Sequence, residues 1–128
     1  MKIPFLKMDG LGDDFVVVFA EDVPQGWTPS PQWAQRVCDR RFGVGADQVL
    51  WVTPGPKMEI WNADGSTAEM CGNGIRAVAL ELRARGAKDS SIGIQTAAGL
   101  KTVSFVGDLV RVNMGVPQIK GPETLKMT

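Results

Sequence analysis

Alternating apolar and polar residues predict β-strands along much of the chain. Val103 and Phe105 precede a Gly-Asp pair, and Val110 and Val112 follow it, so every second residue is apolar on both sides of an expected hairpin turn. Shorter apolar runs bounded by Gly, Pro or Asp are typical of further strands. The predicted strands cover residues 3–8, 15–20, 48–52, 57–61, 92–96, 100–106 and 109–114.

Two other segments have the residue spacing of helices. Ser30 before Pro31 is typical of an N-cap followed by proline at the first helical position, and this helix is expected to run to about Arg41. A second helix is predicted over residues 73–85, with Gly86 as its C-cap. Its apolar residues, spaced i, i+3, i+4 and i+7, are Ile75, Val78, Ala79 and Leu82. Its charges lie in narrow stripes, which predicts that most of the helix surface is buried. Together with the predicted strands, this indicates an α+β fold of mostly antiparallel strands wrapped around one buried central helix.

The length and the charge of the chain limit the number of domains and the kinds of partner that can be expected. The 128 residues are enough for one compact domain. The 14 basic and 14 acidic residues form no block of one sign, which argues against nucleic acid or an anionic membrane surface as partner. The start of the chain lacks the apolar core of a signal peptide, and no segment approaches the ~18 apolar residues of a membrane span. We therefore expect a cytoplasmic protein that acts on a small molecule.

The side chains available for chemistry are few. The chain has no histidine and two cysteines, without paired-cysteine spacing, so no metal site is predicted. Proton transfer near neutral pH would fall to Cys, Asp, Glu or Lys. Cys38 shares a helical face with Trp33 and Val37, and we expect it to be a buried core residue.

Cys71 is the first candidate for chemistry. An Asp-Gly turn at residues 64–65 is expected to lead through a short strand ending at Met70 to Cys71 and to the Gly-Asn-Gly of residues 72–74. Unpaired N–H groups and the positive end of the helix dipole favour an anion there, either a thiolate or a substrate carboxylate. A plain tight turn made by the two glycines explains the same residues equally well.

Residues 72–77 also match the dinucleotide fingerprint G-x-G-x-x-A. That motif requires a buried parallel strand directly before the glycines. The preceding segment here is the short polar TAEM, so we do not predict nucleotide binding.

Polar residues at strand ends complete the candidate set. Asp13, Gln48 and Asn62 each lie in or beside a predicted turn. Ligand contact is one interpretation of these side chains, and capping of the turn or exposure at the strand end is the other.

Three segments, KMDGLGDDFVVV, CDRRFGVGADQ and NADGSTAEMCGNGIR, occur in this order. Together they resemble the amino-terminal half of the diaminopimelate epimerases, over residues 5–117. The resemblance implies one half of a two-domain fold. It also implies a cytoplasmic isomerase that converts LL- to meso-diaminopimelate for lysine and peptidoglycan synthesis, without pyridoxal phosphate or another cofactor.

The resemblance further implies roles for single residues. In this family one cysteine thiolate removes the α-proton of the substrate and an opposing cysteine thiol returns one, and Cys71 matches the first cysteine. Gln48, Asn62, Gly72 and Asn73 match residues that contact substrate.

Two positions depart from the family pattern. Asp9 and Asp13 stand where the family usually has His and Asn. Asp13 is still a candidate for substrate binding, although its carboxylate accepts hydrogen bonds without donating and therefore suits an ammonium group better than a carboxylate.

Family members are longer and carry the second cysteine in a second domain. We therefore expect residues 1–117 to form an amino-terminal domain and residues 118–128 a tail or the start of an interdomain linker. The isolated chain is expected to be inactive, with the carboxy-terminal domain as its missing partner. A homodimer stays open, and so do two other functions: a related cofactor-independent amino-acid racemase, and a non-catalytic binding or assembly module.

Overall fold

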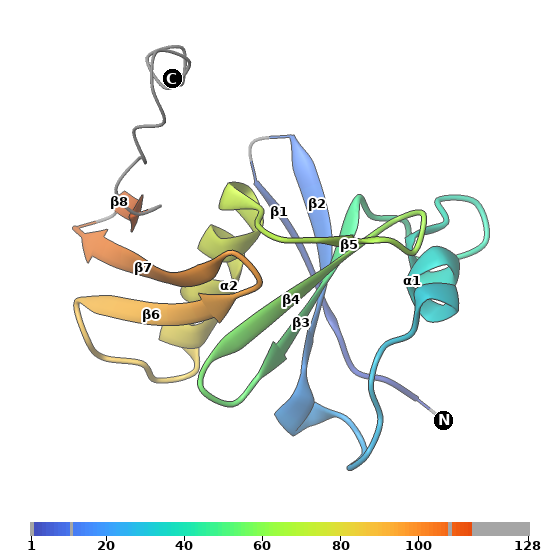
Figure 1. The fold of residues 1–128 in the computed structure, drawn as a ribbon, viewed down its shortest axis with the longest axis horizontal. Coiled ribbons are helices and arrows are strands. Elements are labelled where there is room, and N and C mark those ends of the chain that lie inside the picture. The colour runs from blue at the N-terminus through green and yellow to red at the C-terminus, as the bar shows by residue number, and fades with distance from the viewer. Residues whose placement is uncertain (1, 11, 108, 114–128) are drawn as a thin grey trace.

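A computed structural model describes residues 2–10, 12–107 and 109–113. Its main feature is an eight-stranded sheet with the strand order β1-β2-β3-β4-β6-β7-β8, in which β5 also pairs with β4 (Figure 1). The strands are β1 (Leu6–Gly10), β2 (Asp13–Phe19), β3 (Gln48–Thr53), β4 (Lys57–Asn62), β5 (Thr67–Ala68), β6 (Ser91–Thr96), β7 (Gly99–Val106) and β8 (Leu109–Asn113). The helical segments are the 3-10 turn η1 (Ala20–Asp22), α1 (Pro31–Cys38) and α2 (Gly72–Ala84).

Most neighbouring strands in the sheet are antiparallel, but two pairs are parallel. β2 runs parallel to β3, and β4 runs parallel to β6. A parallel pair needs a crossover connection, and α1 and α2 lie in these two crossovers. The sheet is therefore mixed, which confirms the predicted combination of helices with mainly antiparallel strands.

The two faces of the sheet have separate hydrophobic cores. Successive side chains of a strand point to opposite faces. Phe15 packs in one core with Val78 of α2, whereas its neighbour Val16 packs in the other with Ala34 of α1. Burial of each such large side chain stabilises the fold by about 1.5–3 kcal/mol. The helices α2 and α1 consequently cover opposite faces.

The helix α2 is buried on one side. It contacts β1, β2 and β3 and also β7 and β8, so strands from both ends of the sheet reach it (Figure 1). Ile75 and Val78 are fully buried, whereas Leu80 is 47% exposed and Arg83 is exposed as well. The buried residues of α2 are Gly74, Ile75, Ala77, Val78 and Ala79, so the described strands do not enclose the whole helix. The predicted burial of α2 as an enclosed central helix is therefore not confirmed.

Side-chain capping decides where α1 begins and ends. Ser30 caps its N-terminus through Oγ, as predicted. The helix ends at Cys38, before the predicted end near Arg41. The carboxylate of Asp39 accepts hydrogen bonds from the N–H groups of Arg41 and Phe42, at 2.8 and 2.9 Å, and this local turn replaces a further helical turn.

The first strand differs from its prediction at both ends. The predicted range was 3–8, whereas β1 begins at Leu6 and extends to Gly10. Pro4 has no N–H to donate to a neighbouring strand, which explains the later start. Met114, the predicted end of the last strand, and the predicted domain boundary at residue 117 lie outside the described residues. Among the helices of the described part, none is long and apolar enough to cross a membrane.

Candidate active site

Cys71 is the N-cap of α2, because the helix begins at Gly72, one residue before its predicted start at residue 73. Its Sγ accepts a hydrogen bond from the N–H of Gly74 at 3.3 Å, and its carbonyl oxygen accepts one from Ile75 at 2.9 Å. The N–H groups of Gly72 and Asn73 have no acceptor within the helix, because no helical residue lies four positions before them. The half-buried thiol therefore lies at the positive end of the helix dipole, where an anion is favoured.

The two glycines of this first turn have different surroundings. A Cβ atom at Gly74 would lie 3.2 Å from Cδ1 of Leu50, so the missing side chain allows α2 to pack closely on β3. A Cβ atom at Gly72 would meet no atom of the described chain within 4 Å. Gly74 therefore has a packing role, while the space beside Gly72 is open to a ligand.

Asp13 and Asn73 are joined by a hydrogen bond. Nδ2 of Asn73 donates to Oδ2 of Asp13 at 2.8 Å. Asp13 is the first residue of β2, and Asn73 lies in the first turn of α2. The contact needs only an acceptor at position 13, which an aspartate supplies as well as an asparagine. The departure from the family pattern at Asp13 is thus compatible with this geometry.

Gln48 and Asn62 form the second pair of predicted site residues. They lie opposite each other in the register of β3 and β4. Nε2 of Gln48 donates to Oδ1 of Asn62 at 2.9 Å, and Nδ2 of Asn62 donates to Oγ of Ser66 at 3.1 Å. The two amides are therefore held in fixed orientations at the beginning of β3 and the end of β4.

The sheet topology brings the two pairs together. The parallel strands β2 and β3 begin with Asp13 and Gln48, and β4, which is antiparallel to β3, ends with Asn62. Each of the three lies two residues from a buried residue of the core beneath α2, so strand alternation turns its side chain to the face that α2 covers. These core residues are Phe15, Leu50 and Ile60. The three predicted strand residues therefore lie at one edge of the sheet, beside the start of α2, which carries the other three predicted residues, Cys71, Gly72 and Asn73.

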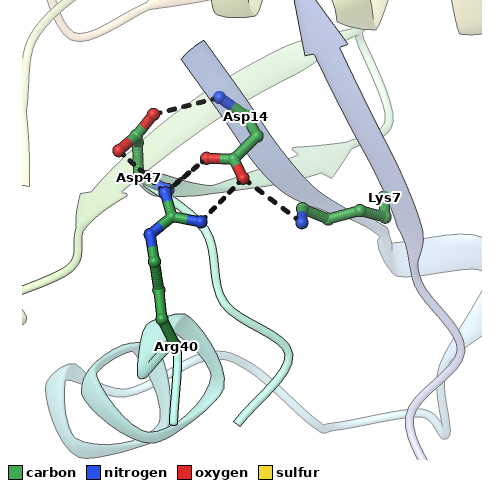
Figure 2. A network of polar contacts seen from close by, with 4 residues as sticks. All are labelled: Lys7, Asp14, Arg40 and Asp47. Atoms are coloured by element: carbon green, nitrogen blue, oxygen red, sulfur yellow. Dashed lines mark hydrogen bonds and ion pairs between the residues drawn. The ribbon is translucent and has the colours of Figure 1, made fainter. Parts of the chain in front are cut away.

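A charged cluster beside this edge was not predicted from the sequence. Arg40 donates from Nη1 to Oδ2 of Asp14 at 3.0 Å and from Nη2 to Oδ1 of the same carboxylate at 2.8 Å (Figure 2). Nη2 also donates to Oδ1 of Asp47 at 3.1 Å, and Nζ of Lys7 lies 3.3 Å from Oδ2 of Asp14. The hydrogen bonds from Arg40 are the main reason that the pKa of the Asp14 carboxyl lies well below its usual range.

The cluster borders a polar cavity of about 460 Å³, which is also lined by Asp9 and Asp13. One feature of the sequence could have indicated the charged cluster: two of its residues are neighbours of predicted site residues. Asp14 directly follows Asp13, and Asp47 directly precedes Gln48, and both neighbours were already candidates.

Cys38 lies in the core on the α1 side of the sheet, as predicted. Burial raises the pKa of its thiol to about 11, so the neutral form is favoured. Cys71 packs against the core on the α2 side, and the sheet therefore separates the two sulfur atoms. Cys38 is not placed to act as a second acid–base group opposite Cys71. Within the described residues, no three His, Cys, Asp or Glu side chains are grouped as metal ligands.

The fold is similar to that of several solved structures. A phenazine biosynthesis protein of the PhzF family from Enterococcus faecalis matches 77% of this chain and 36% of its own chain, with a TM-score of 0.60 and 11% identity. A structure of methylitaconate-delta-isomerase matches 94% of this chain and 39% of its own, with a TM-score of 0.57 and 16% identity. At these identities the likeness concerns the fold. The fold and the site thus define a PhzF-like mixed half-barrel with a cysteine at the N-terminus of its helix α2.

Sequence comparison narrows this class to one family. The family model described as diaminopimelate epimerase matches residues 5–120. The diaminopimelate epimerase of Alkalilimnicola ehrlichii is 45% identical over 95% of this chain, and that of a Synechocystis species is 43% identical over 93%. The chain belongs to the diaminopimelate epimerase family, which confirms the resemblance found in the three segments. It spans about half the length of these relatives, 47% and 45% respectively.

Proposed function

We propose that this chain forms the amino-terminal half of a diaminopimelate epimerase and that Cys71 is one of its two acid–base residues. One observation carries the proposal. In a member of this family, Cys71 caps α2 at the sheet edge where the pairs Asp13–Asn73 and Gln48–Asn62 lie. We further propose that residues 1–117 form the domain and that the protein is cytoplasmic.

The proposed reaction moves one proton on each side of a carbon atom. The Cys71 thiolate removes the α-proton and becomes a thiol, and the electron pair of the C–H bond stays on the α-carbon. A thiol on the opposite side gives its proton to that carbon and becomes a thiolate, which inverts the configuration. The free N–H groups of the first turn of α2 would stabilise the negative charge that develops next to the α-carbon.

The other candidate residues would bind the polar groups of the substrate. The amides of Gln48, Asn62 and Asn73 can both donate and accept, which suits carboxylate and ammonium groups together. The carboxylate of Asp13 suits an ammonium group. Gly72 leaves room for a substrate carboxylate to approach the backbone.

The second acid–base cysteine would come from the part of the relatives that this chain does not match. Cys38, the other cysteine of this chain, lies on the far face of the sheet. The chain by itself is therefore proposed to lack epimerase activity. We leave a homodimer as one arrangement of the complete protein.

The test is solvent deuterium uptake at the α-carbon of LL-diaminopimelate, followed by mass spectrometry. It uses this chain and a chimera that joins it to the unmatched part of the Alkalilimnicola ehrlichii relative. We expect uptake with the chimera and none with the chain. Cys71→Ser in the chimera should lower the rate by at least about 10²-fold, because it removes the acid–base group. Cys38→Ala serves as the matched control and should keep the rate.

Four outcomes would contradict parts of the proposal. Unimpaired uptake by the Cys71→Ser chimera would exclude the role of Cys71. Uptake by the chain itself would exclude a second cysteine from elsewhere. Faster exchange with a monocarboxylic amino acid than with diaminopimelate would favour a related racemase instead. A folded chimera that binds diaminopimelate without any exchange would favour a non-catalytic module.

A further inference from the structure

Asp14 and Asp47 connect the beginnings of two parallel strands. The N–H of Asp47 donates to the carbonyl oxygen of Asp14 at 3.1 Å and to its Oδ1 at 2.9 Å. In return, the N–H of Asp14 donates to Oδ2 of Asp47 at 3.1 Å. These reciprocal hydrogen bonds join β2 to the residue before β3. Asp14 directly follows Asp13, and Asp47 directly precedes Gln48.

This exchange places two carboxylates side by side. Two neighbouring anions repel each other, and the repulsion would separate the strand ends. Nη2 of Arg40 lies between them, at 2.8 Å from Oδ1 of Asp14 and 3.1 Å from Oδ1 of Asp47 (Figure 2). Its second contact, from Nη1 to Asp14, makes that pair bidentate, the geometry in which arginine and carboxylate bind most strongly. Arg40 therefore offsets the repulsion and orients both carboxylates.

Strand alternation links this cluster to the candidate site on the other face. Asp13 and Asp14 are consecutive in β2, so their side chains point to opposite faces of the sheet. Asp14 points to Arg40, and Asp13 points to Asn73 of α2. A rotation of the backbone at Asp14 would consequently turn Asp13 away from Asn73. Asp47 directly precedes Gln48, the first residue of β3, so a movement of the backbone at Asp47 would also move Gln48.

We propose that Arg40 is a positioning residue for the candidate substrate site, because its guanidinium bridges Asp14 and Asp47 and thereby fixes the directions of Asp13 and Gln48. The proposal deepens the function proposed above and rests on it for the identity of the ligand. Arg40 acts through its two carboxylate partners and contacts neither Cys71 nor the pairs Asp13–Asn73 and Gln48–Asn62.

The positioning itself is tested in the 128-residue chain, independently of activity. The readout is the side-chain amide resonances of Gln48, Asn62 and Asn73 in a ¹⁵N-correlated NMR spectrum. We expect Arg40→Met to shift or broaden all three sets, and Arg40→Lys to restore them only in part, since an ammonium cannot bind both carboxylates in the planar geometry of a guanidinium. Arg41→Met is the matched control, because the Arg41 guanidinium lies over the ring of Phe42 and outside the cluster.

Arg40→Met resonances that match those of Arg41→Met would overturn the proposal. If Arg40→Met does not fold, Asp47→Asn replaces it, since this change keeps a side-chain acceptor but removes one charge of the bridge. Asp47→Asn is expected to shift the Gln48 and Asn62 resonances, and unchanged resonances would overturn the proposal equally.

A kinetic measurement on the chimera tests the link to the substrate. Arg40→Met should raise KM for diaminopimelate about tenfold with a smaller change in kcat, because it disturbs binding groups and leaves Cys71 in place. A fall in kcat at unchanged KM would overturn this part. If the chimera without substitutions shows no exchange, the proposed function is wrong. The NMR experiment on the 128-residue chain still tests the positioning role of Arg40 in that case.

Discussion

Asn73 donates a hydrogen bond from Nδ2 to Oδ2 of Asp13 over 2.8 Å, although 60 positions separate the two residues in the chain. The bond ties the beginning of β2 to the first turn of α2. Asn73 lies two positions after Cys71, so the same bond limits how the candidate cysteine and its helix can move relative to the sheet. A long-range polar contact thus supports the local capping geometry.

Substitution of Asp13 separates its acceptor role from its charge. Asp13→Ala removes the acceptor and should lower the free energy of unfolding by about 0.5–1.5 kcal/mol, with a shift of the Asn73 side-chain amide resonances. Asp13→Asn keeps an acceptor oxygen and should leave those resonances close to their original positions. Urea unfolding and NMR measure the two effects. Equal shifts in both variants would show that the charge of Asp13, and not the hydrogen bond, orients Asn73.

The two cysteines should differ strongly in reactivity. We expect iodoacetamide to alkylate Cys71 well before Cys38 in the folded chain, because the thiolate is the reactive form and Cys38 is buried with its pKa raised to about 11. Mass spectrometry of peptides from partly alkylated protein measures the order. Denaturation in urea is the control and should remove the difference. Equal rates in the folded chain would contradict the assigned environments.

Asp14 should make stability depend on pH in the acidic range. Its pKa is lower in the folded chain than the ~3.9 of an unfolded aspartate, so its ionised form stabilises the fold. This contribution is fully present above about pH 4 and is lost as the pH falls from there towards the folded pKa. The difference in free energy of unfolding between the original chain and Asp14→Asn should therefore shrink below about pH 4.

Urea unfolding of both proteins from pH 6 to pH 2 measures this difference and cancels the titration of carboxyl groups that do not interact with Asp14. High salt should reduce it, because the partners Arg40 and Lys7 are partly exposed. A difference that stays constant over the whole range would mean that Asp14 gains nothing from its neighbours.

The two glycines beside Cys71 should differ in how an added side chain affects stability and binding. Gly74→Val places branched carbon atoms against Leu50, which already lies 3.2 Å from the Cβ position, and should destabilise the chain by about 1–3 kcal/mol. Gly72→Ala meets open space and should leave stability within about 0.5 kcal/mol while weakening diaminopimelate binding by the chimera. Thermal unfolding and substrate titration measure these effects. A loss of stability in Gly72→Ala without a loss of binding would argue against a ligand beside Gly72.

Local features of the site could be predicted from the sequence because they depend on neighbouring residues. The serine–proline pair determines the start of α1, and the cysteine before Gly-Asn-Gly determines the cap of α2. The apolar periodicity of α1 likewise placed Cys38 in a core. Asp13, Gln48 and Asn62 were candidates from their places at strand ends, and the resemblance of three segments to one family then implied substrate contacts for Gln48 and Asn62.

Other features depend on tertiary structure because their partners are distant in the chain. Arg40 meets Asp14 across 26 positions, and the backbone of Asp14 meets Asp47 across 33, which no local pattern encodes. The apolar surface of α2 predicted burial, but the extent of burial depends on which strands reach the helix, and Leu80 remains exposed. The sequence by itself determined most of the strands, the N-cap of α1 and the reactive-residue candidates. The tertiary structure decided that these candidates lie at one edge of the sheet, through the parallel pairing of β2 with β3. Strand pairing depends on contacts between segments that are distant in the chain, so no local pattern predicts it.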